Sequence, residues 1–222
     1  MTYLKQSFSN SILLLFLCLS LSACFKDLPD KMVFYQNDFD NNTKANFSIY
    51  GNTGLIDSLK ITTYNNSKVF GRFNSNYVLF KMDTLPAHNA IKIEFDLYLH
   101  DQWDGNHLPP GAAYPDIWQM AIDNNPIFLT TFSNGNYPQS YPNNYQTNML
   151  NSPALSNSWG VLPGVCSNAG KANGTSHYKI EYTTSHTGTF QLALNDVPNP
   201  VNSLCLKSWS IDNLRLTAIM YK

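Results

Sequence analysis

Hydrophobic and polar residues alternate along most of this chain with a repeat of two positions. The clearest example is the run 91–99, where Ile, Phe and Leu take the odd positions and Lys, Glu, Asp and Tyr the even ones. Such a repeat is typical of β-strands that bury one face and expose the other. The even-numbered face, extended to His100, is therefore predicted to be solvated. Similar runs occur at 178–182, 190–194 and 209–221.

The pattern indicates an all-β fold. Beyond the first 24 residues, no stretch of ten or more combines helical periodicity with capping residues. The short strands are separated by turns rich in Gly, Pro, Asn and Asp, and no internal repeat is visible. We therefore expect one antiparallel β-sandwich or jelly roll over residues 33–222. The 199 residues after position 23 fit a single domain of this kind.

The first 24 residues follow a different pattern. A short polar segment with Lys5 precedes an apolar run from Ile12 to Leu21, and Ser-Ala-Cys follows at 22–24. This layout is that of a secretory signal, and the run is shorter than the about 20 residues needed to span a bilayer. A cysteine directly after the small residues resembles bacterial lipoprotein signals. The alternative is an ordinary cleaved signal with a structural Cys24.

The lipoprotein resemblance implies cleavage before Cys24 and acylation of its thiol. It divides the chain into a signal peptide (1–23), a lipid attachment site and tether (24–32) and a domain (33–222). The expected location is the bacterial cell envelope, anchored by lipid to the outer membrane, either periplasmic or surface-exposed. Asp27 resembles the surface-export signals of some Gram-negative lipoproteins, whereas the simpler interpretation of the tether is a flexible, solvated leash.

The charge balance narrows the possible partners. The formal net charge is −1, and loss of Lys5 with the signal would make it −2. A nearly neutral chain offers no basic stripe for nucleic acid and no polybasic patch for lipid head groups. Only 13% of residues are charged while 14% are aromatic. This composition suits an exported β protein that binds neutral polar partners.

Cysteine usage agrees with export. Cys18 would leave with the signal and Cys24 would carry lipid, so Cys166 and Cys205 are the remaining pair. An oxidising compartment favours a disulfide between them, with two buried thiols as the alternative. Closing this loop should stabilise the fold by roughly 4 kcal/mol on the chain-entropy model.

The segment 133–177 is long, almost uncharged and rich in Asn, Ser, Pro, Gly and Tyr. Long loops of this kind are often functional, and exposed aromatic rings can stack on sugars. The alternative is a flap, stapled through Cys166, that only covers one face of the sandwich. The candidate ligand-binding aromatics in and near this segment are Trp103, Tyr137, Tyr141, Tyr145 and Trp159.

Several motifs together resemble a known group of domains. Asn-Asp-Phe-Asp stands at 37–40 and Trp-Ser-Ile-Asp-Asn-Leu at 209–214. The order of these motifs resembles jelly-roll sandwiches of the concanavalin-like, MAM and carbohydrate-binding type, although Ser210 stands where glycine is usual. The resemblance implies a module that binds a glycan or another surface polymer. A protein-binding adhesion or structural subunit is a further possibility. Weaker similarities lie at 95–96, 101–106, 115–118, 130–134 and 139–142.

In such domains the first acidic motif and the last Asp commonly share a structural Ca²⁺. Asp38 and Asp40 are two positions apart, so both carboxylates point the same way on a strand, and Asp212 joins them if the last strand pairs with the first. Ca²⁺ accepts six to eight oxygen ligands in loose geometry. The alternative is that these residues form turns. A second acidic group, either a metal or ligand rim or ordinary turn residues, comprises Asp101, Asp104, Asn106 and Asp116.

An enzyme is the other class to consider. Glu-Phe-Asp-Leu-Tyr at 94–98 resembles the Glu-x-Asp-x-Glu strand of laminarinase-type glycoside hydrolases, which makes Glu94 and Asp96 the catalytic candidates. Tyr98 stands where the second glutamate is expected, and retaining hydrolysis needs two carboxyl groups about 5 Å apart. No nucleophile elbow, phosphate loop or zinc motif occurs. We therefore expect a binding module rather than an enzyme.

Overall fold

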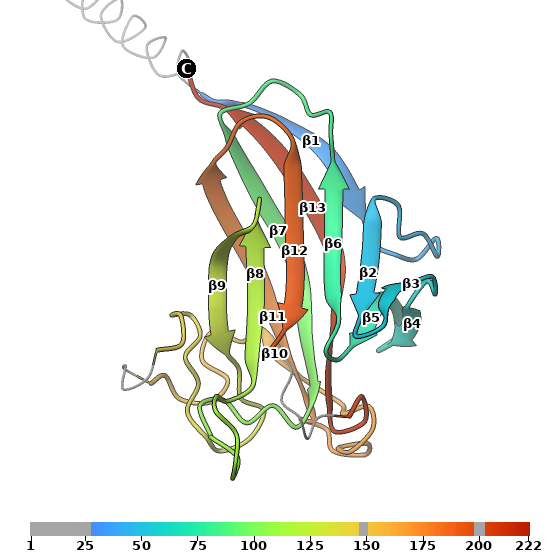
Figure 1. Cartoon of the computed structure of the whole chain (residues 1–222), viewed down its shortest axis with the longest axis vertical. Coiled ribbons are helices and arrows are strands. Elements are labelled where there is room, and N and C mark those ends of the chain that lie inside the picture. Colours follow the sequence, from blue (N-terminus) through green and yellow to red (C-terminus); the bar gives the residue numbers. More distant parts are fainter. Residues whose placement is uncertain (1–27, 147–150, 198–202) are drawn as a thin grey trace, which may run out of the picture.

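The computed structural model describes residues 28–146, 151–197 and 203–222. Within these ranges the only regular elements are thirteen strands. They form two antiparallel sheets packed face to face (Figure 1). From β5 to β8, and again from β11 to β13, each strand lies in the sheet opposite to that of the strand before it. The predicted all-β antiparallel jelly-roll sandwich is thereby confirmed.

Sheet A has the spatial order β10-β11-β7-β13-β5-β4. β5 pairs with the N-terminal half of β13, and β1 pairs with its C-terminal half. Its strands are β1 (Asp30–Asn37), β4 (Ile61–Tyr64), β5 (Ser67–Phe73), β7 (Ala90–Asp101), β10 (Gly160–Leu162), β11 (Thr175–Ser185) and β13 (Lys207–Met220). Sheet B has the order β3-β2-β6-β12-β8-β9. Its strands are β2 (Phe47–Gly51), β3 (Gly54–Ile56), β6 (Tyr77–Met82), β8 (Ile117–Ile122), β9 (Asn125–Thr131) and β12 (Phe190–Asp196).

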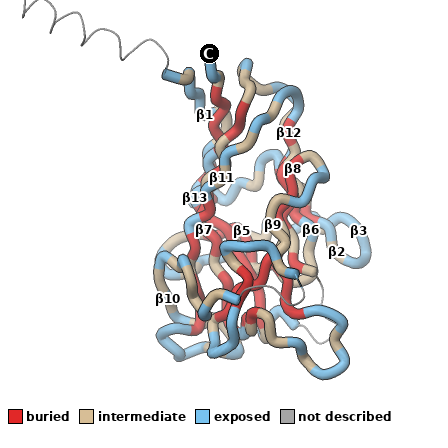
Figure 2. The backbone as a smooth tube through the Cα atoms, turned by 90° about the vertical axis from the view of Figure 1, so that its left-hand side faces the viewer, coloured by how far each residue is buried: buried red, intermediate tan, exposed pale blue. Residues whose placement is uncertain are grey.

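The core lies between the two sheets, where buried positions follow the facing strands (Figure 2). In β7 the odd-numbered side chains from Ile91 to Leu99 are buried, as the alternating pattern predicts. Aromatic rings fill the centre: Trp118 and Trp209 meet edge to face at 6.2 Å, and Phe73 lies 4.7 Å from Trp209. Full burial of each large apolar side chain stabilises the fold by about 1.5–3 kcal/mol.

Three expectations about strands and loops are corrected. β1 begins at Asp30, inside the segment expected to be tether, because residues 30–32 pair with the end of β13. The expected loop 133–177 contains β10 and the start of β11. His100 is buried rather than solvated, because Tyr64 packs on its ring at 4.7 Å and the loop before β11 covers this end of the sheet.

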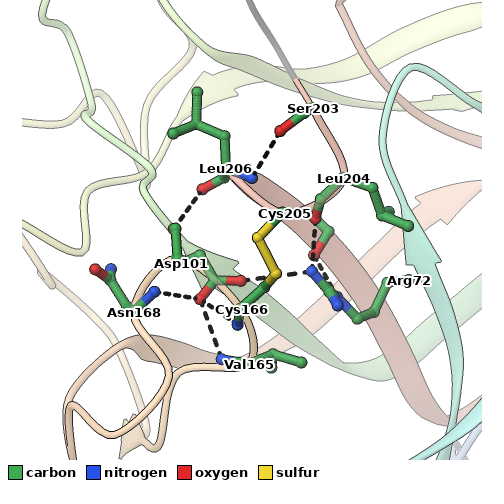
Figure 3. The surroundings of a disulfide bond; sticks show 11 residues. Arg72, Asp101, Val165, Cys166, Asn168, Ser203, Leu204, Cys205 and Leu206 are labelled. Atoms are coloured by element: carbon green, nitrogen blue, oxygen red, sulfur yellow. Dashed lines mark hydrogen bonds and ion pairs between the residues drawn. A yellow bond between two sulfur atoms is a disulfide. The ribbon is translucent and has the colours of Figure 1, made fainter.

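The predicted disulfide between Cys166 and Cys205 is confirmed (Figure 3). Beside it, one carboxylate oxygen of Asp101 accepts hydrogen bonds from the backbone N–H groups of three residues of the disulfide loop. The other oxygen lies 3.5 Å from the guanidinium of Arg72. The loop is thus fastened to the end of β7 as well as to Cys205. The three donors are Val165 at 3.1 Å, Cys166 at 2.9 Å and Asn168 at 3.0 Å.

The expected signal peptide, Cys24 and most of the tether lie outside the described residues. No helix in the part of the chain that the structure describes is long and apolar enough to cross a membrane.

Candidate functional site

A groove of about 300 Å³ crosses the outer face of sheet A. Its walls come from four neighbouring elements, the end of β1, β13, β7 and β11, and most of its side chains are charged or polar. We call it the sheet A groove. It is lined by Gln36, Asp38, Glu94, Phe95, Asp96, Lys179, Ile180, Glu181, Asn213 and Arg215.

Strand register brings these side chains together. Asp96 of β7 lies opposite Lys179 of β11, and two residues earlier Glu94 lies opposite Glu181. On the other side of β7, the pairing with β13 shifts after Asp212. Because side chains alternate along each strand, all of these polar groups share one face.

The shift in β13 is made by Asn213. Its φ is 53°, in the left-handed region that asparagine tolerates better than most residues. This conformation turns the side chain over β7, where its amide donates a hydrogen bond to Asp96 at 2.8 Å. The backbone conformation of Asn213 therefore places its amide beside Asp96 in the sheet A groove.

Asp96 is held as a carboxylate. His177 Nε2 lies 2.8 Å from its other oxygen, and the His177 ring stacks on Tyr98 at 4.7 Å. Burial raises the pKa of Asp96, but hydrogen bonds from His177 and Asn213 and the charges of His177 and Lys179 outweigh it, so the pKa lies below its ordinary value. Burial and the charge of Asp96 raise the pKa of Tyr98.

The two glutamates of the groove share one cation. Lys92 Nζ lies 2.9 Å from Glu94 and 2.7 Å from Glu181. The hydrogen bonds that its ammonium donates to these carboxylates raise the pKa of Lys92. These three side chains are partly or largely exposed, so the two ion pairs orient them more than they stabilise the fold.

Trp159 stands at the rim of the sheet A groove. Its side chain is 69% exposed, the largest exposure among the large apolar side chains of the described residues. The ammonium of Lys179 lies 4.2 Å from the ring centroid, and the Trp159 N–H donates to the carbonyl of His177 at 2.7 Å. The backbone bond and the cation–π contact fix a flat apolar ring in water beside a polar groove.

The other predicted aromatics are distributed differently. Trp103 is almost wholly buried: it is 1% exposed and donates its indole N–H to the carbonyl of Ser208. Tyr141 is half-buried, and its ring packs against Phe132 at 4.8 Å. Tyr145 is half-buried and pairs with β9 through its N–H. Tyr137 is 43% exposed and stacks on His107 at 4.1 Å.

The three aspartates of the predicted calcium site lie near the middle of β13, where the end of β1 pairs with it. Asp38 accepts the N–H of Asp40, and Asp40 accepts the N–H of Lys68. Burial raises the pKa of Asp212 to about 6, with smaller contributions from the charges of Asp96 and Asp40. Among the described residues, no group of three or more His, Cys, Asp or Glu side chains is arranged to hold a metal ion. The calcium site stays a prediction.

The second acidic group does not form one cluster. Asp101 binds the disulfide loop, and Asp116 pairs with the buried ammonium of Lys207. Asn106 accepts a hydrogen bond from Ser140 at 2.9 Å. Asp104 lines a separate pocket with Asp101.

Sequence reasoning missed His177, the partner of Asp96, and the groove residues Lys179, Asn213 and Arg215. The alternation in 177–181 carries the signal for the first two, because His, Lys and Glu there occupy one face of a strand. Asn213 and Arg215 reach the groove through the pairing of β13 with β7 and the register shift in β13. The local sequence pattern predicts neither.

No protein-family model matches the chain, and no curated protein sequence does. Among solved structures, it is similar to a family GH115 4-O-methyl-α-glucuronidase with specificity for decorated arabinogalactans (TM-score 0.36, 10% identity), covering 84% of this chain but 18% of that one. It is also similar to the C-terminal CBM6 of a laminarinase from Zobellia galactanivorans (TM-score 0.29, 13% identity, 86% and 99% covered). A third is the K2 cleaved adhesin domain of Lys-gingipain (TM-score 0.36, 16% identity, 84% and 97% covered). At these TM-scores and identities the likeness supports no argument about function. The function is argued from the groove instead.

Proposed function

We propose that the protein is a cell-envelope lipoprotein whose jelly-roll domain binds a glycan or another surface polymer in the sheet A groove. One observation carries this proposal: the exposed ring of Trp159 beside a groove lined by hydrogen-bonding side chains from four elements. Sugars have apolar ring faces and polar edges. A flat aromatic ring next to fixed donors and acceptors matches both.

The groups of the groove divide the binding between them. Trp159 offers a stacking face. The stacking of a nucleic-acid base on an aromatic side chain, a similar contact, contributes about 1–3 kcal/mol per base. Lys179 and Arg215 donate hydrogen bonds, and Glu94, Asp96 and Glu181 accept them from hydroxyl groups. The side chains of Trp159, Lys179 and the three carboxylates are held by ion pairs or ring contacts before a ligand arrives, so they lose little ordering entropy on binding.

A glycan array probed with the full-length chain in detergent tests this proposal. We expect Trp159→Ala to weaken binding to the recognised glycan about tenfold or more, because the stacking face is lost. Tyr221→Ala is the matched control, since it removes an exposed ring outside the groove. Equal binding by Trp159→Ala and the parent would reject the groove as the site. No glycan bound by the parent would favour a protein-binding adhesion or structural subunit instead.

The groove also holds the carboxylates of the glycosidase alternative. A general acid needs a raised pKa, whereas hydrogen bonds and nearby charges keep the pKa of Asp96 below its ordinary value. Asp96 is therefore suited to accept hydrogen bonds rather than to act as the general acid. Release of reducing ends from β-glucans that disappears in Glu94→Gln would favour a glycoside hydrolase over a binding module.

Calcium is proposed as a structural ion for Asp38, Asp40 and Asp212. Asp212 is buried and feels the charges of two other carboxylates, a setting that a cation would relieve. We expect excess chelator to lower the melting temperature of the parent, and Asp212→Ala to remove that response. Saturating calcium would stabilise the folded state by about 2.7 kcal/mol at a hundredfold excess over Kd. A parent curve unchanged by chelator would leave these residues as turn formers.

A further inference from the structure

One lysine and one aspartate meet inside the sandwich. The side chain of Lys207, the first residue of β13, is 2% exposed, and its Nζ contacts a carboxylate oxygen of Asp116, whose side chain is 9% exposed. Asp116 directly precedes β8, so the contact connects a strand of sheet A with a strand of sheet B (Figure 1). Two residues further along these strands, Trp209 and Trp118 meet in the core. We call Lys207 and Asp116 the buried Lys–Asp pair.

The amine of this pair has few polar partners. An ammonium group has three N–H donors, but among the described residues Lys207 Nζ makes a hydrogen bond to Asp116 alone. The centroid of the Trp103 ring lies 5.4 Å from the same nitrogen. Burial lowers the pKa of Lys207 to about 7, although the charge of Asp104 opposes this shift. A desolvated lysine of this kind can act as a nucleophile.

The contact also brings an acyl group to that nucleophile. Removing two charges from water is costly even when they pair, and proton transfer from the ammonium to the carboxylate leaves a neutral amine and a neutral carboxyl group. These are the two reactants of amide formation. Because β13 and the start of β8 hold them in contact, their reaction needs no bimolecular encounter.

We propose that Lys207 and Asp116 form an isopeptide bond that joins β13 to the start of β8. Lys207 Nζ attacks Asp116 Cγ, so the N–C bond forms and one C–O bond of the carboxyl group breaks. Counted from the ion pair, two of the three ammonium hydrogens leave with that oxygen as water. The step therefore needs no oxidant and no other reagent. The amide is uncharged, so the interior no longer holds two charges.

The bond would add a second covalent link to this end of the sandwich. Cys205, two residues before Lys207, carries the disulfide to Cys166. Unlike the disulfide, an amide survives reducing agents. The buried Lys–Asp pair lines no part of the sheet A groove, so this inference does not depend on the proposed function.

Mass spectrometry of the full-length protein, reduced, alkylated and digested with trypsin, tests the bond. Trypsin cuts after Lys and Arg, so Asp116 falls in segment 93–171 and Lys207 would end segment 180–207. Reduction opens the disulfide, which joins the same two segments. We expect 93–171 to remain attached to 180–215, uncut after Lys207, at the summed mass of the two segments less one water.

Variants locate the bond. Asp116→Ala and Lys207→Ala should each release 93–171 as a separate segment. Asp83→Ala is the matched control, because it removes the carboxylate of an exposed ion pair, and its segments should remain joined.

Two outcomes would overturn the inference. Release of separate 93–171 and 180–207 segments from the parent would mean that the pair is an ordinary ion pair. Joined segments that persist in Asp116→Ala would place the link at another residue. The first result comes from the parent alone, so the test does not depend on whether either variant folds.

Discussion

The imidazole of His100 is fully buried beside neutral groups. Its two nitrogens lie 3.2 Å from Thr175 Oγ1 and 2.9 Å from Ser210 Oγ, and Tyr64 packs on its ring. Burial, with a smaller contribution from the charge of Arg72, lowers the pKa of His100 to about 3. The folded protein therefore keeps this ring neutral at pH values where the unfolded chain protonates it.

This difference predicts a pH dependence of stability. Between the unfolded pKa of about 6.5 and the folded value of about 3, the unfolded chain binds a proton that the folded protein does not. Stability should therefore fall as the pH drops below about 6.5, by up to about 1.4 kcal/mol per pH unit from this residue. Denaturant titrations of the parent and His100→Gln from pH 4 to 7 measure it. Parallel curves for the two proteins would contradict the prediction.

At the scale of elements, the disulfide loop and the end of β7 form one unit through two different links. One is the bond between Cys166 and Cys205, and the other is the set of N–H groups that donate to Asp101. Either link limits the freedom of the same stretch of chain. Their contributions to stability are therefore expected to depend on each other.

A double-mutant cycle tests this coupling. We expect Cys166→Ala with Cys205→Ala to lower the free energy of unfolding by about 2–4 kcal/mol, and Asp101→Asn by about 3–5 kcal/mol, because Arg72 loses its buried partner. The combined variant should lose less than the sum, since the second change acts on a loop already released. Denaturant unfolding measures all three. Strict additivity would mean that the two links act independently.

Local pattern predicted four of the thirteen described strands, β7, β11, β12 and β13, but not which of their ends are covered. The alternation in β7 correctly identified the buried side chains from Ile91 to Leu99. It failed at His100 because a period of two carries no information about a loop that folds over the sheet. The pattern also did not predict that Trp103 is buried against β13 or that the ring of Tyr141 packs on Phe132.

The candidate site was predictable in part. Glu94, Asp96 and Trp159 were identified from their own segments, and the cysteine pair from elimination of the other cysteines. Lys179 and Arg215 reach the groove only through strand pairing, and Asn213 only through its left-handed backbone conformation. Non-local register of this kind is set by the packed sandwich, so no single segment encodes it.

At the scale of the whole molecule, membrane attachment is predicted to depend on Cys24 alone. We expect Cys24→Ser to move the full-length protein from the membrane to the soluble fraction, because one residue would carry the lipid. The domain should stay folded, since the sandwich begins only at β1. Fractionation with a melting curve of the soluble protein measures both. A variant that still pellets with membranes would show another anchor.

The pairing of β1 with β13 has a consequence for where ligands can be reached. Asp30 pairs with Met220 at one end of β13, whereas Lys207, at the other end, pairs with Asp101, which binds the disulfide loop. At about 3.3 Å per residue, the 14 residues of β13 separate these ends by about 40 Å. A sandwich anchored through Cys24 would hold the disulfide loop at the far end of that distance and the sheet A groove, which Asn213 of β13 lines, part of the way along it.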